Sequence, residues 1–371
     1  MQTIDKLIKE LKHLKITITN LKDIAFLCGG QYLAPSLWKK GKIPVITNCD
    51  GIYGYTNKAN RNEPCISISS RGYAGKTIQY WNIPIWASQC ITISEKDSNV
   101  ICLRYLYYYL LAIANQISCL AATGAIGALY MRDLNNLMIK YPPLAYQQSI
   151  VKIFDKFLDL DNYLHNELEL RINQYHYWLH YLFNSKHNSL LKHATKCKLS
   201  KLCLINKGKQ LNKNLLSDTW LYPVYNGGID LSGYWSTYNT NKNSIIISQG
   251  GCSAGYVNWI NTNFWAGAHC YILTNASSKV NYRYLYYYLK SIQNHLFNLK
   301  KGAGIPGIAK QDLDNVEVIL PSLQTQQFIV NKLDLFNELI NDKNSGISKE
   351  IQLRKKQYNY YLNLILSFNN K

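Results

Sequence analysis

The stretch RYLYYYL occurs twice in the chain, at Arg104–Leu110 and again at Arg283–Leu289, which is 179 residues further on. An arginine followed by six tyrosines and leucines is too specific a sequence to recur by chance in 371 residues. The repeat therefore indicates an internal duplication. In each copy we expect this stretch to be scaffold packing, with its arginine against an acidic neighbour or a phosphate.

The same offset of 179 aligns shorter matches on both sides of the repeated stretch. These are Trp86-Ala87 with Trp265-Ala266, Asp133-Leu134 with Asp312-Leu313, and Gln147-Gln148 with Gln326-Gln327. Beyond Phe157 and Phe336 the offset becomes 183, so four residues have been added around Asn341–Gly346. Four residues are close to one helical turn, which keeps the helix faces nearly in phase. A period of this length indicates two whole domains.

Each copy has a mixed part followed by a long helix. Short β-rich runs, among them Cys65–Ser69, Trp86–Ser94 and Ile245–Ser248, are separated by turn residues, and the repeated stretch then opens a short helix. Apolar residues recur every three or four positions from Ile150 to Leu182 and from Ile329 to Ile365. The sequence predicts an α+β fold, with two duplicated α/β domains and two long coiled-coil helices that pack on each other. The expected boundaries are 1–145, 146–184, 185–323 and 324–371.

The charge of the chain points to an anionic partner. With 41 lysines and arginines against 22 aspartates and glutamates, the formal net charge is +19. A protein this basic usually binds nucleic acid, although richness in lysine, asparagine, isoleucine and tyrosine also fits an AT-rich genome. The ten cysteines form no CxxC pair, so we expect reduced cysteines in a cytoplasmic protein.

One segment has the length of a membrane span. Tyr105–Met131 carries no charged residue over 27 positions, but polar residues and glycines interrupt it. The matching segment of the second copy contains Lys290, Lys300 and Lys301, which would be costly in lipid. The first residues, MQTIDKLIKELKHLK, alternate charged and apolar positions as an amphipathic helix does, unlike a signal peptide. We therefore expect no membrane association.

No motif in the sequence predicts catalysis. SRGYAGKT (Ser70–Thr77) differs at one position from the phosphate-binding pattern GxxxxGK[ST], and the matching QGGCSAGY (Gln249–Tyr256) lacks the lysine. A tight glycine turn after a strand is the better interpretation. YPPL (Tyr141–Leu144) lacks the Asn or Asp of the aminomethyltransferase motif, and the histidines are scattered. The sequence therefore predicts a binding protein without a metal or catalytic site.

Candidate binding residues gather near glycines in both copies. Lysine and backbone amides bind phosphates without sequence preference, whereas Asn, Gln, Arg and Tyr can recognise base edges. The matching loops at Asn48–Thr56 and Asn226–Tyr234 differ in sequence, which implies two different targets. The candidate DNA-binding residues are Lys39, Lys40, Lys42, Tyr53, Arg71, Tyr73, Lys76, Lys207, Lys209, Tyr225, Asn226, Gln249, Lys300 and Lys301.

The chain resembles the DNA-specificity subunit of type I restriction-modification systems over nearly its whole length. Thr123–Val151 and Gly302–Val330 carry the resemblance, with a glycine-containing turn, a short helix, a strand ending in proline and a glutamine-bearing start of the long helix. The helix ends Glu167–Trp178 and Lys349–Tyr361 also carry it. Departures are local, at Tyr130, Pro143 and Ala145.

The resemblance implies two target-recognition domains, each of which recognises one half of a bipartite site in double-stranded DNA. It also implies that the long helices are antiparallel, set the gap between the halves and dock methyltransferase subunits, two per chain. These partners carry S-adenosylmethionine and methylate adenine at N6, and a separate motor-nuclease subunit uses ATP and Mg²⁺. The implied docking and spacer residues are Gln147, Gln148, Arg171, Gln174, Tyr175, Gln326, Gln327, Arg354, Gln357 and Tyr358.

The chain itself is then non-catalytic and holds no cofactor of its own. Two other interpretations stay open from the residues alone. One is a specificity chain that serves another restriction architecture, and the other is a stand-alone regulator with two DNA-binding domains.

Overall fold

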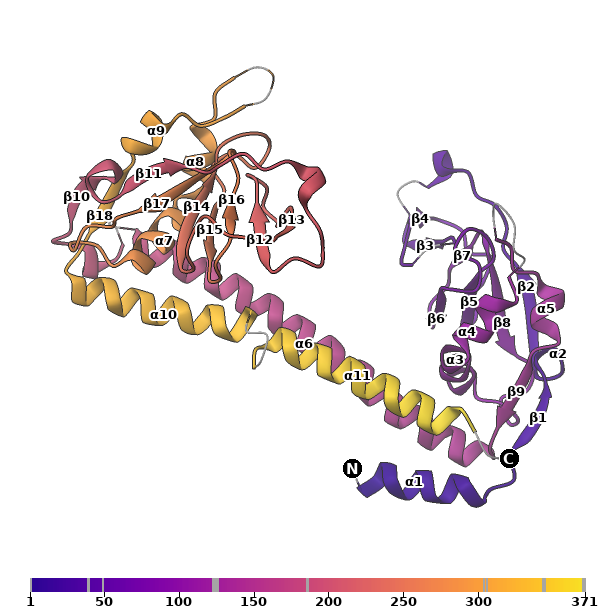
Figure 1. Ribbon diagram of the computed structural model, residues 1–371. Helices are drawn as coiled ribbons and strands as arrows, with labels where there is room; N and C mark the ends of the chain where they lie inside the picture. The colour runs from indigo at the N-terminus through magenta and orange to yellow at the C-terminus, as the bar shows by residue number, and fades with distance from the viewer. Residues whose placement is uncertain are drawn as a thin grey trace. The chain divides into compact units, whose positions relative to one another are not determined.

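The computed structural model describes residues 2–38, 41–48, 50–121, 127–184, 187–302, 304, 306–341 and 345–368. The chain divides into two compact units, and each is described by itself (Figure 1). Unit 1 comprises Met1–His165 together with Glu350–Lys371, and unit 2 comprises Asn166–Lys349. Both units mix short strands with helices, so the predicted α+β class is confirmed.

Unit 1 is built around a four-stranded antiparallel sheet with the order β2-β8-β5-β6. A three-stranded sheet, β4-β3-β7, and a pair, β1-β9, complete its strands. The elements are α1 (Gln2–His13), β1 (Thr17–Asn20), α2 (Leu21–Ile24), β2 (Ala25–Gly29), η1 (Pro35–Leu37), β3 (Ile43–Ile46), β4 (Gly54–Thr56), β5 (Cys65–Ser69), β6 (Ile78–Trp81), β7 (Trp86–Ala87), β8 (Cys90–Glu95), α3 (Leu103–Ala112), α4 (Ala114–Cys119), α5 (Met131–Asn135) and β9 (Met138–Tyr141).

Unit 2 repeats this arrangement. Its sheets have the orders β11-β17-β14-β15, β13-β12-β16 and β10-β18, and the parallel pair β12·β16 corresponds to β3·β7. The elements are η2 (Ser189–Leu191), β10 (Thr195–Lys198), η3 (Leu199–Lys201), β11 (Leu204–Lys207), η4 (Lys213–Leu215), β12 (Tyr222–Tyr225), β13 (Gly233–Trp235), β14 (Ser244–Ser248), β15 (Val257–Ile260), β16 (Trp265–Ala266), β17 (Cys270–Thr274), α7 (Tyr282–Ser291), α8 (Gln293–Asn298), α9 (Lys310–Asp314) and β18 (Glu317–Leu320).

The central strands form where the sequence predicts them. β5 coincides with the CISIS run, and all five of its residues are buried because the strand has sheet neighbours on both edges and α3 on one face. Isoleucines alternate with small residues there, a pattern that suits a pleated and covered strand. β14 occupies the matching position in unit 2, so the duplication predicted from the sequence is confirmed in the fold.

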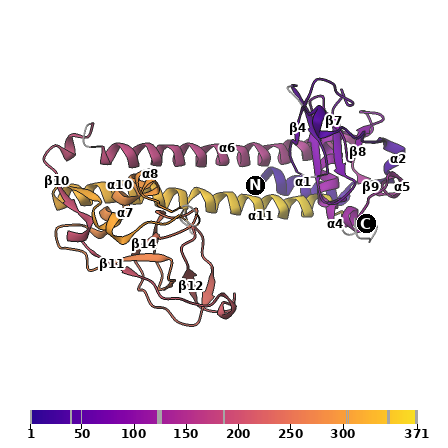
Figure 2. The ribbon, with the colours of Figure 1, turned by 90° about the horizontal axis from the view of Figure 1, so that it is seen from above.

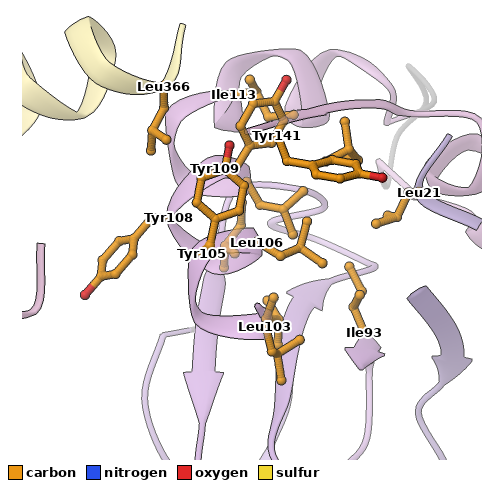
Figure 3. Packing of buried hydrophobic residues seen from close by; sticks show 14 of the residues in the cluster. Leu21, Ile93, Leu103, Tyr105, Leu106, Tyr108, Tyr109, Ile113, Tyr141 and Leu366 are labelled. Atoms are coloured by element: carbon orange, nitrogen blue, oxygen red, sulfur yellow. The ribbon is translucent and has the colours of Figure 1, made fainter. Parts of the chain in front are cut away.

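The repeated stretch forms α3 in unit 1 and α7 in unit 2, each on the four-stranded sheet of its unit. Tyr105, Tyr108, Tyr284 and Tyr287 are fully buried and are among the largest side chains of the two cores. Figure 3 shows Tyr105 and Tyr109 of α3 among leucines and isoleucines of the unit 1 core, with Leu366 on the same side. The stretch is therefore scaffold packing, as expected.

The long helices are shared between the units. α6 (Leu144–Phe183) is continuous, with its residues up to His165 in unit 1 and its later residues in unit 2. The second long helix is divided into α10 (Leu323–Asn341) in unit 2 and α11 (Ile347–Leu366), which lies almost wholly in unit 1. Each unit thus contains the first part of its own long helix and the second part of the other copy's helix.

Within each unit, these two helix segments pack against each other. In unit 1, α11 runs antiparallel to the first part of α6 (Figures 1 and 2), and the ring of Tyr358 lies 5.7 Å from that of Phe154. In unit 2, Leu179 of α6 shares a buried cluster with Ile329 and Leu333 of α10. The expectation that the two long helices pack on each other is confirmed inside both units.

Candidate nucleic-acid interface and helix faces

The arginine of each repeated stretch bonds to the long helix that follows it in the same copy. In unit 1, Arg104 Nε and Tyr108 Oη both donate to Asp155 Oδ1 of α6, at 2.9 and 2.5 Å. In unit 2, Arg283 Nε and Tyr287 Oη donate to Asp334 Oδ1 of α10, at 2.8 and 2.5 Å. The acidic neighbour expected for both arginines is therefore present.

Burial keeps the tyrosines of these clusters protonated. It raises the pKa of Tyr108 and Tyr287 far above that of a free phenol, and the hydrogen bond to the aspartate raises each further. Burial also raises the pKa of Tyr175 in unit 2 and of Tyr358 in unit 1. All four hydroxyls therefore stay protonated even at a pH at which a free phenol ionises.

The glycine turn predicted at Ser70–Thr77 follows β5 directly. Gly72 and Gly75 have φ values of +67° and +70°, and a Cβ on Gly75 would lie 2.9 Å from Ile117 O. The Gly75 and Lys76 amides donate to Ser69 O and Tyr73 O within the turn, so neither is free to bind a phosphate. The glycine-turn interpretation is confirmed, and the exposed side chains of Arg71, Tyr73 and Lys76 project from it.

The matching turn of unit 2 also contains two glycines with positive φ, and one lysine side chain bonds to it. Gly251 and Gly255 have φ values of +76° and +90°. Lys300 Nζ donates to Cys252 O at 2.9 Å, while Lys301 Nζ pairs with Asp312 at 3.0 Å. Both lysines were predicted as phosphate ligands, and the structure already engages both within unit 2.

The remaining candidates lie near the small sheet, at the end of β11 or at the glycine turn. In unit 1, Lys42 and Tyr53 are exposed, and Lys39 and Lys40 lie outside the described residues. In unit 2, Lys207 and Lys209 are exposed where the chain leaves β11. Tyr225 and Asn226 are half-buried at the end of β12, and Gln249 is half-buried at the glycine turn. In unit 2 the candidates are therefore distributed over the glycine turn, the end of β11 and the end of β12.

Gln147 and Gln326, predicted at the docking faces, are fully buried. Gln147 Nε2 donates to Val100 O and Pro142 O, and its Oε1 accepts from Cys102 N. Gln326 makes the matching three bonds, with Lys279 O, Pro321 O and Asn281 N. These two amides fasten the start of each long helix to its domain, whereas the adjacent Gln148 and Gln327 are exposed.

The helix ends predicted to dock partners carry two matching surface networks. In unit 2, Arg171 Nε donates to Glu167 Oε1 at 2.9 Å and its Nη1 donates to Gln174 Oε1 at 2.8 Å. In unit 1, Arg354 makes the same bonds to Glu350 and Gln357, at 2.7 and 2.8 Å. These contacts hold both arginines along the helix surface.

Exposed apolar residues accompany both networks and were not predicted from the sequence. Leu170 and Tyr177 in unit 2 match Leu353 and Tyr360 in unit 1, and all four are well exposed. Their spacing of seven places each pair on one helix face. An alignment of the two copies could have found these residues. Other positions of each helix already form its buried apolar face, so matched apolar residues outside that face stand out as exposed. We call each set of network and apolar residues a helix face.

Within the described ranges, no group of three or more His, Cys, Asp or Glu side chains is arranged to hold a metal ion. The same part of the chain contains no helix that is long and apolar enough to cross a membrane. The features that stand out are therefore the duplicated scaffold, the candidate DNA-binding side chains of each unit and the two helix faces.

Two stretches, residues 14–174 and 192–353, each match the type I restriction modification DNA specificity domain. The chain belongs to this family. A type I specificity subunit is the non-catalytic, DNA-recognising component of a restriction-modification system, and this chain has two target-recognition domains. The two matches fall on the two copies recognised from the RYLYYYL repeat, so the predicted family is confirmed.

Similarity to named specificity subunits extends over most of this chain and most of each relative. A Mycoplasma pneumoniae protein named as a type I specificity subunit is 27% identical over 365 residues, which cover 94% of this chain and 96% of that protein. The specificity subunit of the Escherichia coli enzymes EcoR124I and EcoR124II is 25% identical and covers 88% and 87%. The crystal structure of an S subunit from Mycoplasma genitalium has the same fold, with a TM-score of 0.64 at 20% identity over 95% of this chain and 96% of that chain.

Proposed function

We propose that unit 1 and unit 2 each recognise one half of a bipartite sequence in double-stranded DNA. The observation that carries this proposal is the duplication, in which two matching scaffolds hold loops of different sequence. A common scaffold presents each set of loops in the same way, while different side chains select different bases. The net charge of +19 supports contact with a polyanion.

The helix faces support docking of two methyltransferase subunits per chain. One face lies in each unit, and the two present the same Glu-Arg-Gln network beside a leucine and a tyrosine. Tyrosine and arginine are enriched among residues that contribute strongly to protein interfaces. Two copies of one partner can therefore bind through the same contacts, one on each helix face.

The continuous helix α6 supports a role in setting the gap between the half-sites. Its 40 residues would extend about 60 Å at the usual rise, which exceeds one turn of duplex DNA of about 35 Å. In this proposal the partners bring the chemistry, with S-adenosylmethionine in the methyltransferase for adenine N6 methylation, and ATP with Mg²⁺ in a motor-nuclease subunit. The complex would act in the cytoplasm.

The proposal is tested by sequencing single DNA molecules from cells that produce this chain with a methyltransferase encoded beside it. We expect N6-methyladenine in a sequence of two parts separated by a fixed gap. A soluble complex that leaves the DNA unmethylated would contradict the proposal. Tight binding of one site by the chain alone, with no complex formed, would instead favour a stand-alone regulator.

Docking is tested by truncating one face at a time. We expect Leu353→Ala with Tyr360→Ala, or Leu170→Ala with Tyr177→Ala, to remove one methyltransferase subunit from the complex in native mass spectrometry. Leu204→Ala is the control, since Leu204 is also exposed but lies on β11. Retention of both subunits by both double variants would show that the partner binds elsewhere.

A further inference from the structure

The three-stranded sheet is fixed to its domain by the same bonds in both units. Asn239 Nδ2 donates to Ala266 O and Asn239 Oδ1 accepts from Ala266 N, at 3.0 and 2.7 Å. Asn60 makes the same two bonds with Ala87, at 2.9 and 2.7 Å. In addition, Trp265 Nε1 donates to Lys209 O, and Trp86 Nε1 donates to Gln31 O. The frame under both small sheets is therefore the same.

The side chains that these sheets present are different. In unit 2, exposed apolar residues occur before β12 and in the loop after it, at Trp220, Leu221, Ile229 and Leu231. In unit 1, the exposed apolar residues are Leu37, Ile52, Tyr53 and Tyr55. Large exposed apolar side chains close together on a surface usually mark an interaction site. Variable side chains on a common frame are what two different half-sites require.

A second observation points to a ligand at this sheet. Thr47 follows β3 and Asn226 follows β12, at matching positions, and both side chains hold a buried oxygen, Oγ1 and Oδ1. Neither oxygen has a hydrogen-bond partner among the residues that the structure describes. A buried polar atom without a partner is rare and costs stability. Arg283 Nη1, in the scaffold at α7, is a further such atom, but only Thr47 and Asn226 occupy matching positions, where a ligand would supply the missing bond.

The surroundings of Asn226 show how the amide is placed. It borders a pocket of about 290 Å³ lined by Leu211, Lys213, Leu216, Val224, Ser232 and Gly267. A Cβ on Gly267 would lie 2.2 Å from Asn226 Oδ1, so the glycine leaves the room that the amide occupies. Lys213 is exposed at the same pocket. Positive charge thus borders the polar position.

We infer that the small sheet β13-β12-β16 is the part of unit 2 that discriminates bases, and that Asn226 is its specificity-determining residue for an adenine. This inference rests on the proposed function. Asparagine can bond adenine N6 and N7 through its Oδ1 and Nδ2, and apolar side chains contact the methyl group of thymine. The amide turns out of its pocket to do so, and side-chain changes of this kind are common on binding. Trp220 and Leu221, at the other end of β12, supply apolar contacts elsewhere in the same half-site.

The test is the methylation sequence produced by variants of the full chain with its methyltransferase. Asn226→Ala is expected to relax one A·T pair in one half-site at least tenfold, and to leave the other half-site and the gap unchanged. Leu221→Ala is expected to change the same half-site, and because Leu221 is 74% exposed this substitution leaves folding intact. Thr47→Ala is expected to change only the other half-site.

The unchanged half-site shows that each variant chain is folded and assembled. Leu204→Ala is the control, since Leu204 is 53% exposed on β11, outside the small sheet. An unchanged sequence in Asn226→Ala and Leu221→Ala, with methylation retained, would overturn the inference while leaving the proposed function in place. Absence of any bipartite sequence with the wild-type chain would refute the proposed function itself.

Discussion

Two buried glutamines show how much a single side chain fixes in this fold. Gln147 and Gln326 each join three backbone groups, one at the end of a strand, one in a loop and one at the start of the repeated helix. Satisfying these groups in the interior requires both a donor and an acceptor on one side chain, which an amide supplies. From the sequence, a polar residue at a helix start is interpreted as a surface residue.

We expect Gln326→Leu to destabilise unit 2 by on the order of 3 kcal/mol, because it leaves three buried backbone groups unpaired. Gln327→Leu, at the adjacent exposed position, is the matched control and should cost under about 1 kcal/mol. Urea unfolding followed by circular dichroism measures both. Equal losses for the two variants would contradict the structural role given to Gln326.

Lys290 is a half-buried cation in a position where the other copy has Leu111. Its Nζ donates to Val257 O at 3.0 Å and lies 3.9 Å from the centre of the Tyr256 ring. Burial lowers the pKa of Lys290 to about 8, and His176, whose own pKa is lowered by burial and then by His180 and Lys290, is a nearby cation when protonated. The lysine is therefore a site where stability depends on pH.

The folded state holds a proton on Lys290 less tightly than the unfolded state does. The lysine consequently destabilises unit 2 fully below about pH 8, and this effect disappears as pH rises toward the unfolded value of 10.5. We expect Lys290→Leu to be more stable than wild type by about 1 kcal/mol at pH 7, with the advantage lost near pH 10.5. Urea midpoints across this range, with Lys279→Leu as the exposed control, check it. An advantage that does not change with pH would contradict this account.

At the scale of elements, α6 contributes about half of its length to each unit. Each of its parts is fastened separately, by Asp155 to α3 in unit 1 and by the cluster of Leu179 and Leu182 in unit 2. A change of length between these attachments leaves both recognition domains intact. The helix therefore offers a way to alter the gap alone.

We expect insertion of four residues between His165 and Asn166 to lengthen the gap in the methylated sequence by about one or two base pairs, since it adds about 6 Å and close to one helical turn. Both half-sites should stay the same. Replacing four exposed residues of α6 without changing its length is the control. A gap that stays the same after insertion would show that α6 does not set the spacing.

At the scale of the whole molecule, the excess of positive charge should govern affinity more than selectivity. We expect Lys207→Gln with Lys209→Gln to weaken binding to specific and non-specific duplexes alike, and to reduce the slope of log affinity against log salt by about two. Fluorescence anisotropy from about 50 to 200 mM salt measures this. Lys6→Gln with Lys9→Gln on α1 is the control, and an unchanged slope in the first variant would remove these lysines from the interface.

The duplication made much of this molecule predictable. It placed β5, β14, α3 and α7 correctly, and it placed the interruption of the second long helix near Gly346. The small sheets were not predicted, because β4 and β13 have three residues and β7 and β16 have two, too few to show a period. The apolar positions of a helix also do not indicate which other helix will pack against them. The sequence therefore could not predict that each unit contains a helix segment from the other copy.

The shared helices have a consequence for the order in which the protein can mature during synthesis. The core of unit 1 includes Leu362, Ile365 and Leu366 of α11, although all the other parts of that unit are translated before unit 2. Unit 1 therefore cannot complete its core until the second domain has also been synthesised. Until then the apolar residues around Phe154 lack the α11 side chains that pack against them. Unit 2 has no such delay, because its borrowed helix segment precedes it in the chain.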